Sequence, residues 1–194
     1  AAADVDRQRE EIEQVRARAG GIAVLHGVEV DIMLAGSLDF DDELLGRFDI
    51  VLASLHDWGG HDGARLTERY LRAVRHPLVN VITHPTNRAP GQSDGYALDF
   101  DALWAAAVET GTAIEIDGAP GHLDLDGALA RLAAAAGVTL VVDSDCHRAD
   151  ALGRQMQFGI GTARRGWIEP RHVLNTRRAA DVRAFIARKR ARGQ

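Results

Sequence analysis

Short apolar runs alternate along the chain with longer segments in which apolar residues recur every three or four positions. The runs have the length of buried β-strands, and the longer segments have the period of amphipathic helices. Strands are predicted at 22–25 (running on to residue 29), 50–53, 79–82, 112–116 and 139–142, with a shorter one near 158–160. Helices are predicted at 4–19, 41–45, 64–75, 100–109, 125–136 and 179–189.

Apolar strands that alternate with helices predict an α/β fold with a parallel sheet covered on both faces. Either a (β/α) barrel or an open doubly wound sheet fits this pattern. No glycine-rich phosphate loop follows any of the strands, which argues against a nucleotide cofactor. The 194 residues correspond to a single domain, residues 1–194.

The composition is that of an ordinary globular protein, with 46% hydrophobic and 26% charged residues. No apolar run approaches the length of a membrane span, and no signal peptide is visible at the start. The single cysteine, Cys146, excludes an internal disulfide framework. A cytoplasmic protein without a membrane partner is therefore expected.

Charge is unevenly distributed. Residues 163–194 carry ten basic and two acidic side chains, a net charge of +8, and the net charge of −5 leaves −13 for residues 1–162. The basic C-terminal helix, about 177–192, is compatible with a nucleic-acid contact or with a simply solvated helix.

Residues that commonly bind metals follow four of the predicted strands. Glu29 follows the first, His56 the second and His84 the third, and Asp145 and His147 follow the strand at 139–142. The carboxyl ends of parallel strands share one edge of a sheet, where active sites form, so these five side chains are expected to converge.

Imidazole and carboxylate groups suit Zn²⁺, Mn²⁺ and Fe²⁺, and five of them favour a site for two or more ions. Paired ions hold a phosphoryl group and activate water, which predicts hydrolysis of a phosphate ester. Any one such histidine is more often a structural residue, and the prediction depends on four strand ends having the same character. His26, His61, His76 and His172 are interpreted as turn or surface residues, and His122 is left open.

Several segments resemble the PHP (polymerase and histidinol phosphatase) domain, and more narrowly the C-terminal PHP domain of bacterial family X DNA polymerases. The resemblance covers about residues 5–190. The segments that carry it are 27–32, 53–56, 83–88, 144–147, 161–167 and 173–176.

The resemblance implies a distorted (β/α)7 barrel with up to three Mn²⁺ or Zn²⁺ ions at its C-terminal face. It implies that Glu29, His56 and His84 complete one metal site, that Asp145 belongs to a second and that His147 belongs to a third. Arg88 matches a position near the substrate phosphate. The expected nucleophile is a metal-activated water, and no separate catalytic side chain is assigned.

The sequence departs from the family at its beginning. It has no His-x-His motif and no Thr-Asp-His segment, so only one of the three metal sites is complete. A partial barrel that lacks its first two strands is therefore expected, in a chain whose polymerase part and first PHP segments lie upstream. Asp117 and His122 stand where polymerase-linked members often have Asn and Arg.

The function implied is 3′→5′ exonuclease or related DNA end processing in DNA repair, with DNA as the partner through the parent polymerase. For these 194 residues alone, weak or no activity is expected. Two alternatives remain open: a small-molecule phosphatase of the histidinol-phosphate type, and a non-catalytic structural PHP module.

Overall fold

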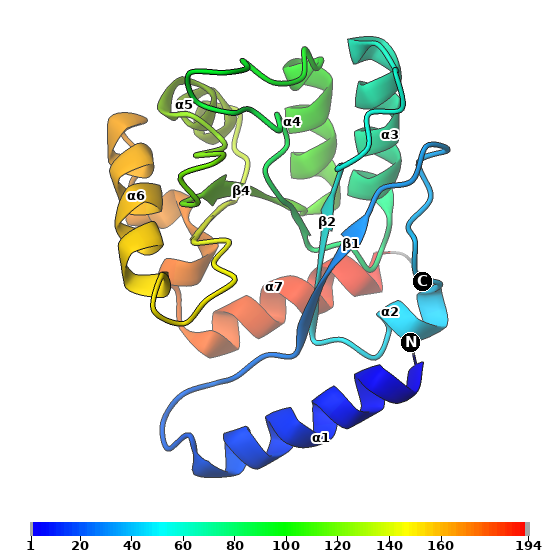
Figure 1. Cartoon of the computed structure of the whole chain (residues 1–194), viewed down its shortest axis with the longest axis vertical. Helices are drawn as coiled ribbons and strands as arrows, with labels where there is room; N and C mark the ends of the chain where they lie inside the picture. Colours follow the sequence, from blue (N-terminus) through cyan, green and yellow to red (C-terminus); the bar gives the residue numbers. More distant parts are fainter. Residues whose placement is uncertain (1, 193–194) are drawn as a thin grey trace.

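A five-stranded parallel β-sheet forms the centre of the protein in the computed structural model, which describes residues 2–192 (Figure 1). The strand order is β1-β2-β3-β4-β5, so every strand lies beside its neighbour in sequence. A doubly wound sheet would reverse its order at one point, whereas a barrel adds strands in sequence. The fold is therefore a partial α/β barrel. The strands are β1 (Gly27–Asp31), β2 (Ile50–Ser54), β3 (Val81–Ile82), β4 (Ala113–Asp117) and β5 (Leu140–Asp143).

Helices connect the strands and cover the sheet. Four of them begin after an aspartate whose carboxylate accepts from a backbone N–H of the first turn, namely Asp41, Asp62, Asp99 and Asp126. Two short 3-10 turns, Pro170–His172 and Leu174–Thr176, precede the last helix. The helices are α1 (Ala2–Arg18), α2 (Asp42–Leu45), α3 (Gly63–Arg75), α4 (Phe100–Thr110), α5 (Gly127–Ala135), α6 (Leu152–Arg165) and α7 (Ala179–Ala191).

The two faces of the sheet have different environments. On the outer face, Val51, Ile82 and Ile114 belong to the main hydrophobic core, which also contains side chains of α3, α4 and α5. On the inner face, a smaller core joins Val81 and Ala113 to Phe185, Ile186 and their neighbours on α7. Because side chains alternate along a strand, the same strands contribute to both cores.

Two predicted strands differ in the structure. The first begins at Gly27, not Ile22, because Gly27 is the first residue that pairs with β2, opposite Ile50; Ile22 itself is 72% exposed. The predicted strand at 158–160 is wrong, since these residues lie within α6. The buried side of that helix is formed by residues four positions apart: Gln155, Gly159 and Ala163. The short apolar run at 158–160 hides this helical spacing in the sequence.

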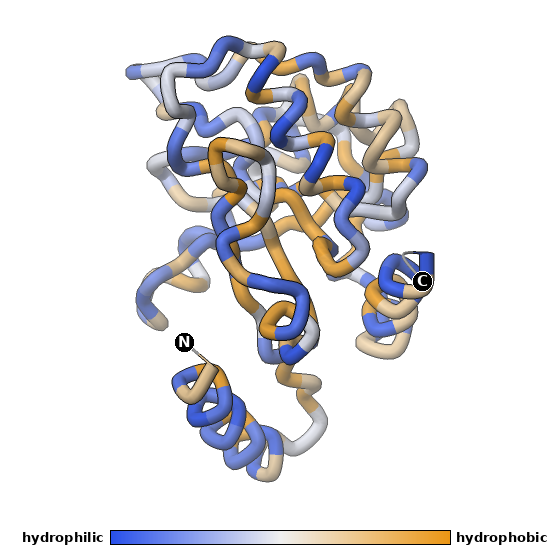
Figure 2. The backbone as a smooth tube through the Cα atoms, turned by 90° about the vertical axis from the view of Figure 1, so that its right-hand side faces the viewer, coloured by the Kyte–Doolittle hydropathy of each residue, from blue (hydrophilic) through white to orange (hydrophobic). Residues whose placement is uncertain are grey.

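The interpretation of His26 as a turn or surface residue is also wrong. His26 is 1% exposed, its Nε2 lies 2.9 Å from Oε1 of Gln8 on α1, and its ring packs edge-on against Phe48. Arg16 of α1 in turn pairs with Asp49. Polar contacts thus attach α1, which Figure 2 shows as mostly hydrophilic and set apart from the sheet.

Side chains also stabilise the fold beyond the strand ladder. The amide of Asn175 pairs with both backbone groups of Val142, accepting from its N–H at 3.1 Å and donating to its carbonyl at 2.6 Å. Asn175 therefore replaces a neighbouring strand at the outer edge of β5. Across residues 2–192, no helix is both long and apolar enough to span a membrane.

Candidate metal site

Three of the five predicted residues converge at the carboxyl edge of the sheet. Glu29 lies on β1, His56 follows β2 and His84 follows β3, and one ligand atom from each lies within 4.8 Å of the other two. Oε1 of Glu29 lies 3.1 Å from Nε2 of His84 and 3.8 Å from Nε2 of His56. The parallel register brings these strand ends together, as expected for this type of sheet.

Glu29 is held as a carboxylate. Its burial alone would raise its pKa, but hydrogen bonds from His84, Ser54 and Thr83 outweigh that effect and lower the pKa to about 2. The hydroxyl of Thr83 donates to Oε1 at 3.2 Å. About a third of the Glu29 side chain, 32%, is exposed, so a ligand can reach the carboxylate from solvent.

His56 presents Nε2 to this cluster because its other ring nitrogen is already bound. Nδ1 lies 2.5 Å from Oδ1 of Asp31 and 3.2 Å from Oγ of Ser54. Asp31 lies two residues beyond Glu29 on β1, so both carboxylates are on the same face of the strand. A carboxylate behind an imidazole is the arrangement commonly found behind metal-binding histidines.

His84 is the buried member of the cluster, with only 4% of its side chain exposed. Its φ of 26° is unusual for a residue with a side chain, and its backbone N–H donates to Oε2 of Glu115 at 2.6 Å. Burial lowers the pKa of His84, but the hydrogen bond to Glu29 and the nearby negative charges together raise it more, and the net pKa is above its usual value. The ring of His122 stacks on it at a centroid distance of 5.1 Å.

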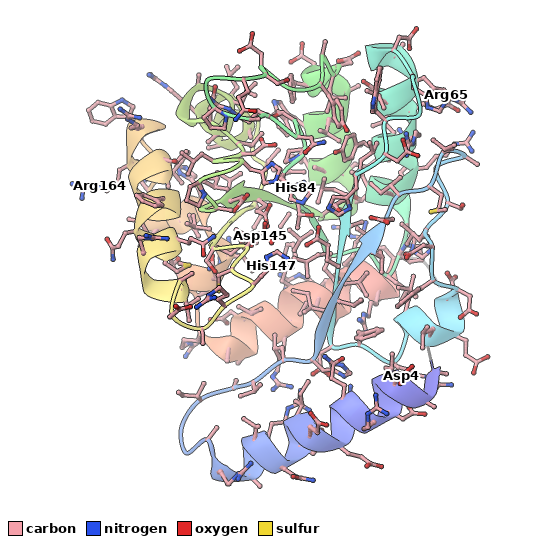
Figure 3. The ribbon with its side chains drawn as sticks, viewed as in Figure 1. Asp4, Arg65, His84, Asp145, His147 and Arg164 are labelled. Atoms are coloured by element: carbon pink, nitrogen blue, oxygen red, sulfur yellow. The ribbon has the colours of Figure 1, made fainter. Side chains whose placement is uncertain are left out.

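Asp145 and His147 lie on the loop after β5 and are outside the three-residue cluster. The Asp145 side chain is 22% exposed, and that of His147 is 85% exposed. Nδ1 of His147 lies 3.1 Å from the backbone oxygen of Asp145, so the ring folds back on its own loop. In the view of Figure 3, both residues project just below His84. Their assignment as ligands stays a prediction.

Arg88 is engaged elsewhere. Its Nη1 lies 3.5 Å from Oδ2 of Asp126, the residue that caps the start of α5. Its backbone oxygen lies 3.3 Å from Nδ1 of His122, whose ring stacks on His84. Arg88 is thus linked to the cluster through its backbone, and a phosphate contact by its guanidinium stays a prediction.

Buried carboxyl groups lie beneath the cluster on β4 and β5. Burial raises the pKa of Glu115 well above its ordinary value, and the nearby Asp143 raises it further. Burial also raises the pKa of Asp117 to about 7, against the effect of its hydrogen bond from the backbone of Ala119. A neutral Glu115 can accept from His84 without adding another negative charge next to Glu29.

The donor set fits a divalent transition-metal ion. Two imidazoles and a carboxylate are the ligand types that Zn²⁺ and Mn²⁺ take from proteins. Both Nε2 atoms face the same oxygen of Glu29, and Asp31 and Thr83 hold His56 and Glu29 in place from behind. A cation between the three groups would be bound by the electron pairs of both Nε2 atoms and of that oxygen.

Sequence reasoning found the three converging residues and missed two that hold them. Asp31 could have been found from the two-residue period of β1, which places it beside Glu29. Glu115 gave no comparable signal, because it lies inside an apolar strand whose other residues predict only burial.

Comparisons with known proteins agree with this geometry. The chain is 38% identical, over 94% of its length, to the DNA polymerase/3′-5′ exonuclease PolX of Bacillus subtilis, of which it covers 32%. It is 36% identical, over 69% of its length, to a probable phosphatase of Shewanella sp. (strain ANA-3), of which it covers 54%. A probable phosphatase of Thermoanaerobacter sp. is 33% identical over 80% of the chain. No family model matches the chain.

The sheet order, the His–His–Glu cluster and these similarities together confirm the resemblance to PHP domains seen in the sequence. The chain is similar to bacterial PolX over almost its whole length, and to the probable phosphatases over a shorter part. The chain spans about a third of PolX and about half of the first phosphatase.

Proposed function

We propose that this chain is a metal-dependent phosphoesterase module that acts on DNA ends. The observation that carries the proposal is the convergence of Nε2 of His56 and Nε2 of His84 on one oxygen of Glu29. A divalent cation bound there supplies positive charge to a phosphate oxygen and makes water nucleophilic near neutral pH. Mn²⁺ and Zn²⁺ are the candidates that the donor set favours.

The side chains contribute positioning and charge. Glu29 remains ionised at all physiological pH values because its pKa is about 2, so it offers a permanent negative charge. Asp31 orients His56, and Glu115 fixes the backbone of His84. Preorganised groups of this kind lower the cost of binding a charged transition state.

DNA is proposed as the substrate class on the basis of how much of the chain each relative matches. The relative named as an exonuclease matches 94% of the chain, whereas the phosphatase of strain ANA-3 matches 69%. The proposal therefore includes 3′→5′ end processing, in the context of DNA repair beside a polymerase. Asp145, His147 and Arg88 are proposed to take part as further metal ligands and as a phosphate contact.

A small-molecule phosphatase is the second candidate, since several relatives are named as probable phosphatases. The two functions can be separated by supplying Mn²⁺ and comparing a labelled oligonucleotide with small phosphomonoesters. Metal binding by the chain is measured in parallel by calorimetry.

The expected result is Mn²⁺ binding that is lost in Glu29→Gln, together with at most weak release of nucleotides from the oligonucleotide that requires Mn²⁺ and is lost in the same variant. Faster hydrolysis of the phosphomonoesters would favour the second candidate. A wild-type chain that binds no Mn²⁺, or activity that is unchanged in Glu29→Gln, would overturn the proposal and support a structural module. Glu109→Gln, an exposed change on α4, is the matched control.

A further inference from the structure

An exposed tryptophan follows α6, on a part of the molecule that the metal site does not use. Trp167 is 77% exposed, although tryptophan is usually well buried. Its φ is 58°, and its N–H donates to the backbone oxygen of Arg164 at 3.1 Å. Few bulky residues adopt such a conformation, which costs free energy and here holds an indole in solvent.

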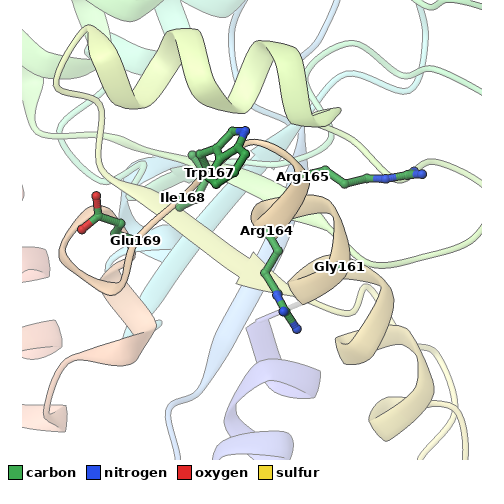
Figure 4. A pocket seen from close by; sticks show the side chains of 6 residues that line it. All are labelled: Gly161, Arg164, Arg165, Trp167, Ile168 and Glu169. Carbon is green, nitrogen blue, oxygen red and sulfur yellow. The ribbon is translucent and has the colours of Figure 1, made fainter.

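Unpaired arginines line the same depression as this indole. Arg164 and Arg165 line an open depression with Trp167, and Figure 4 shows the three side chains spreading from one turn. Arg165 also lines a second depression, with Arg131 of α5. Within residues 2–192, the guanidinium groups of these three arginines make no hydrogen bond or ion pair with another side chain.

Acidic neighbours do not cancel this charge. The carboxylates that line the two depressions are Glu169 and Asp126. Glu169 pairs with Arg171 through both oxygens, at 2.6 and 2.7 Å, and Asp126 pairs with Arg88 at 3.5 Å. The surface therefore keeps a local positive charge on a chain whose net charge is −5.

A second aromatic ring extends the same surface along α6. Phe158 is 41% exposed, and it lies seven residues before Arg165, on the same side of the helix. The two aromatic rings, Phe158 and Trp167, thus flank Arg164 and Arg165 along the chain. This combination matches the chemistry that binds single-stranded nucleic acid, in which bases stack on aromatic rings and cations contact the phosphates.

We propose that Trp167, Phe158 and the arginines around them form a binding surface for single-stranded nucleic acid. The surface is distinct from the metal site. The helix α6 starts after the loop that carries Asp145 and His147, and its 14 residues place its far end about 20 Å further on. Binding there does not depend on hydrolysis, so the two proposals can fail separately.

The experiment measures binding of a fluorescently labelled oligothymidylate to the chain by anisotropy, in EDTA, over a range of salt concentrations. Trp167→Ala is expected to weaken binding about 5- to 160-fold, the usual effect of removing one stacked base contact. Trp167→Phe keeps a ring and is expected to restore most of the affinity. Glu109→Gln, an exposed change on α4, is expected to bind as the wild type does.

The arginines are tested through the salt dependence. Arg164→Ala combined with Arg165→Ala is expected to reduce the slope of log affinity against log salt by about 1.4, because each phosphate contact contributes about 0.7 on a single strand. Arg183→Ala combined with Arg188→Ala removes the same charge from exposed positions on α7 and serves as the control.

Equal binding by wild type and Trp167→Ala would overturn the proposal. So would displacement of the oligonucleotide by poly-glutamate at equal charge concentration, since that would indicate a surface for an acidic protein. A salt slope that falls equally in both double variants would show that the contact is not localised at α6, and would overturn it as well.

Discussion

Nδ1 of His56 lies 2.5 Å from Oδ1 of Asp31, a residue that sequence reasoning did not select. This contact leaves Nε2 of His56 free to face Glu29. It also favours the tautomer in which Nδ1 carries the proton, so that Nε2 can donate an electron pair to a cation. The geometry of the candidate metal site therefore depends on a residue that does not itself contact the ion.

Replacing Asp31 by asparagine is expected to reduce the affinity for Mn²⁺ or Zn²⁺ about 10- to 100-fold, the usual effect of losing a carboxylate behind a metal-binding histidine. Calorimetric titration measures the affinity. Asp57→Asn removes a charge next to His56 without touching its ring, since Asp57 accepts from the backbone of Gly59. Equal losses in both variants would mean that general charge, and not the contact with Nδ1, determines affinity.

Glu115 provides a second test of positioning. Burial raises its pKa well above the ordinary value, which favours the neutral form, and it accepts from the N–H of His84 at 2.6 Å. Glu115→Gln can keep this hydrogen bond and is expected to bind Mn²⁺ as the wild type does. Glu115→Ala leaves the buried N–H unpaired, which is expected to cost about 1–3 kcal/mol of stability and to weaken metal binding.

Urea unfolding and metal titration of the two Glu115 variants provide the measurements. Glu115→Gln distinguishes a positioning role from a charge role. It removes a negative charge only at pH values above the raised pKa of Glu115, where the wild-type side chain is ionised. If Glu115→Gln loses as much metal affinity as Glu115→Ala, an ionised Glu115 is required and the interpretation of its neutral state is wrong.

Lys189, the only lysine, gives a pH dependence that is unrelated to the metal site. It is 3% exposed, and its ammonium donates to the carbonyl of Val74 at 2.6 Å and to Oγ1 of Thr112 at 2.8 Å. Burial, with a smaller contribution from Arg192, lowers its pKa from 10.5 to about 8. Between these values the unfolded chain binds more protons, so stability rises with pH in this window.

The free energy of unfolding of wild type relative to Lys189→Met is therefore expected to increase from pH 8 to 10.5, by up to about 3 kcal/mol. Tyr70, whose pKa burial raises, has the opposite effect on stability at high pH. Because it is present in both proteins, its effect cancels in the comparison. Urea unfolding at several pH values measures the difference. The same series on Arg183→Met, an exposed change on α7, is expected to be flat, and a flat series for Lys189→Met would contradict the prediction.

Much of the fold could be predicted because its strands are apolar runs with clear boundaries. Those at 50–53 and 139–142 are confirmed to within a residue at each end. The run at 158–160 failed because three apolar positions fit either period, and the contact that selects the helix is tertiary. The packing of α6 on β5 cannot be predicted from the local sequence alone.

The candidate metal site was likewise predictable only in part. The rule that polar residues at parallel strand ends share an edge correctly placed Glu29, His56 and His84 together. It did not fix how the loop after β5 folds, and there the side chain of His147 is 85% exposed. Loop conformation depends on turn geometry, such as the φ of 39° at Asp145, which no periodicity reveals.

Gly159 tests the close packing of α6 on the sheet. A Cβ atom added there would lie 2.9 Å from the backbone oxygen of Asp143 and 3.1 Å from Cγ1 of Val142. Gly159→Ala is therefore expected to destabilise the protein by about 1–3 kcal/mol, because the helix must move away from β5. The loop at 144–151, which carries Asp145 and His147, would move with it.

Gly153 is the matched control, since it lies on the same helix with no atom within 4 Å of an added Cβ. Gly153→Ala is expected to stabilise the protein by up to about 1 kcal/mol, the difference in helix propensity between the two residues. Urea unfolding of both variants gives two effects of opposite sign from the same substitution. If both stabilise, α6 does not lie against β5 as closely as its backbone places it, and the position of the Asp145 loop would have to be revised with it.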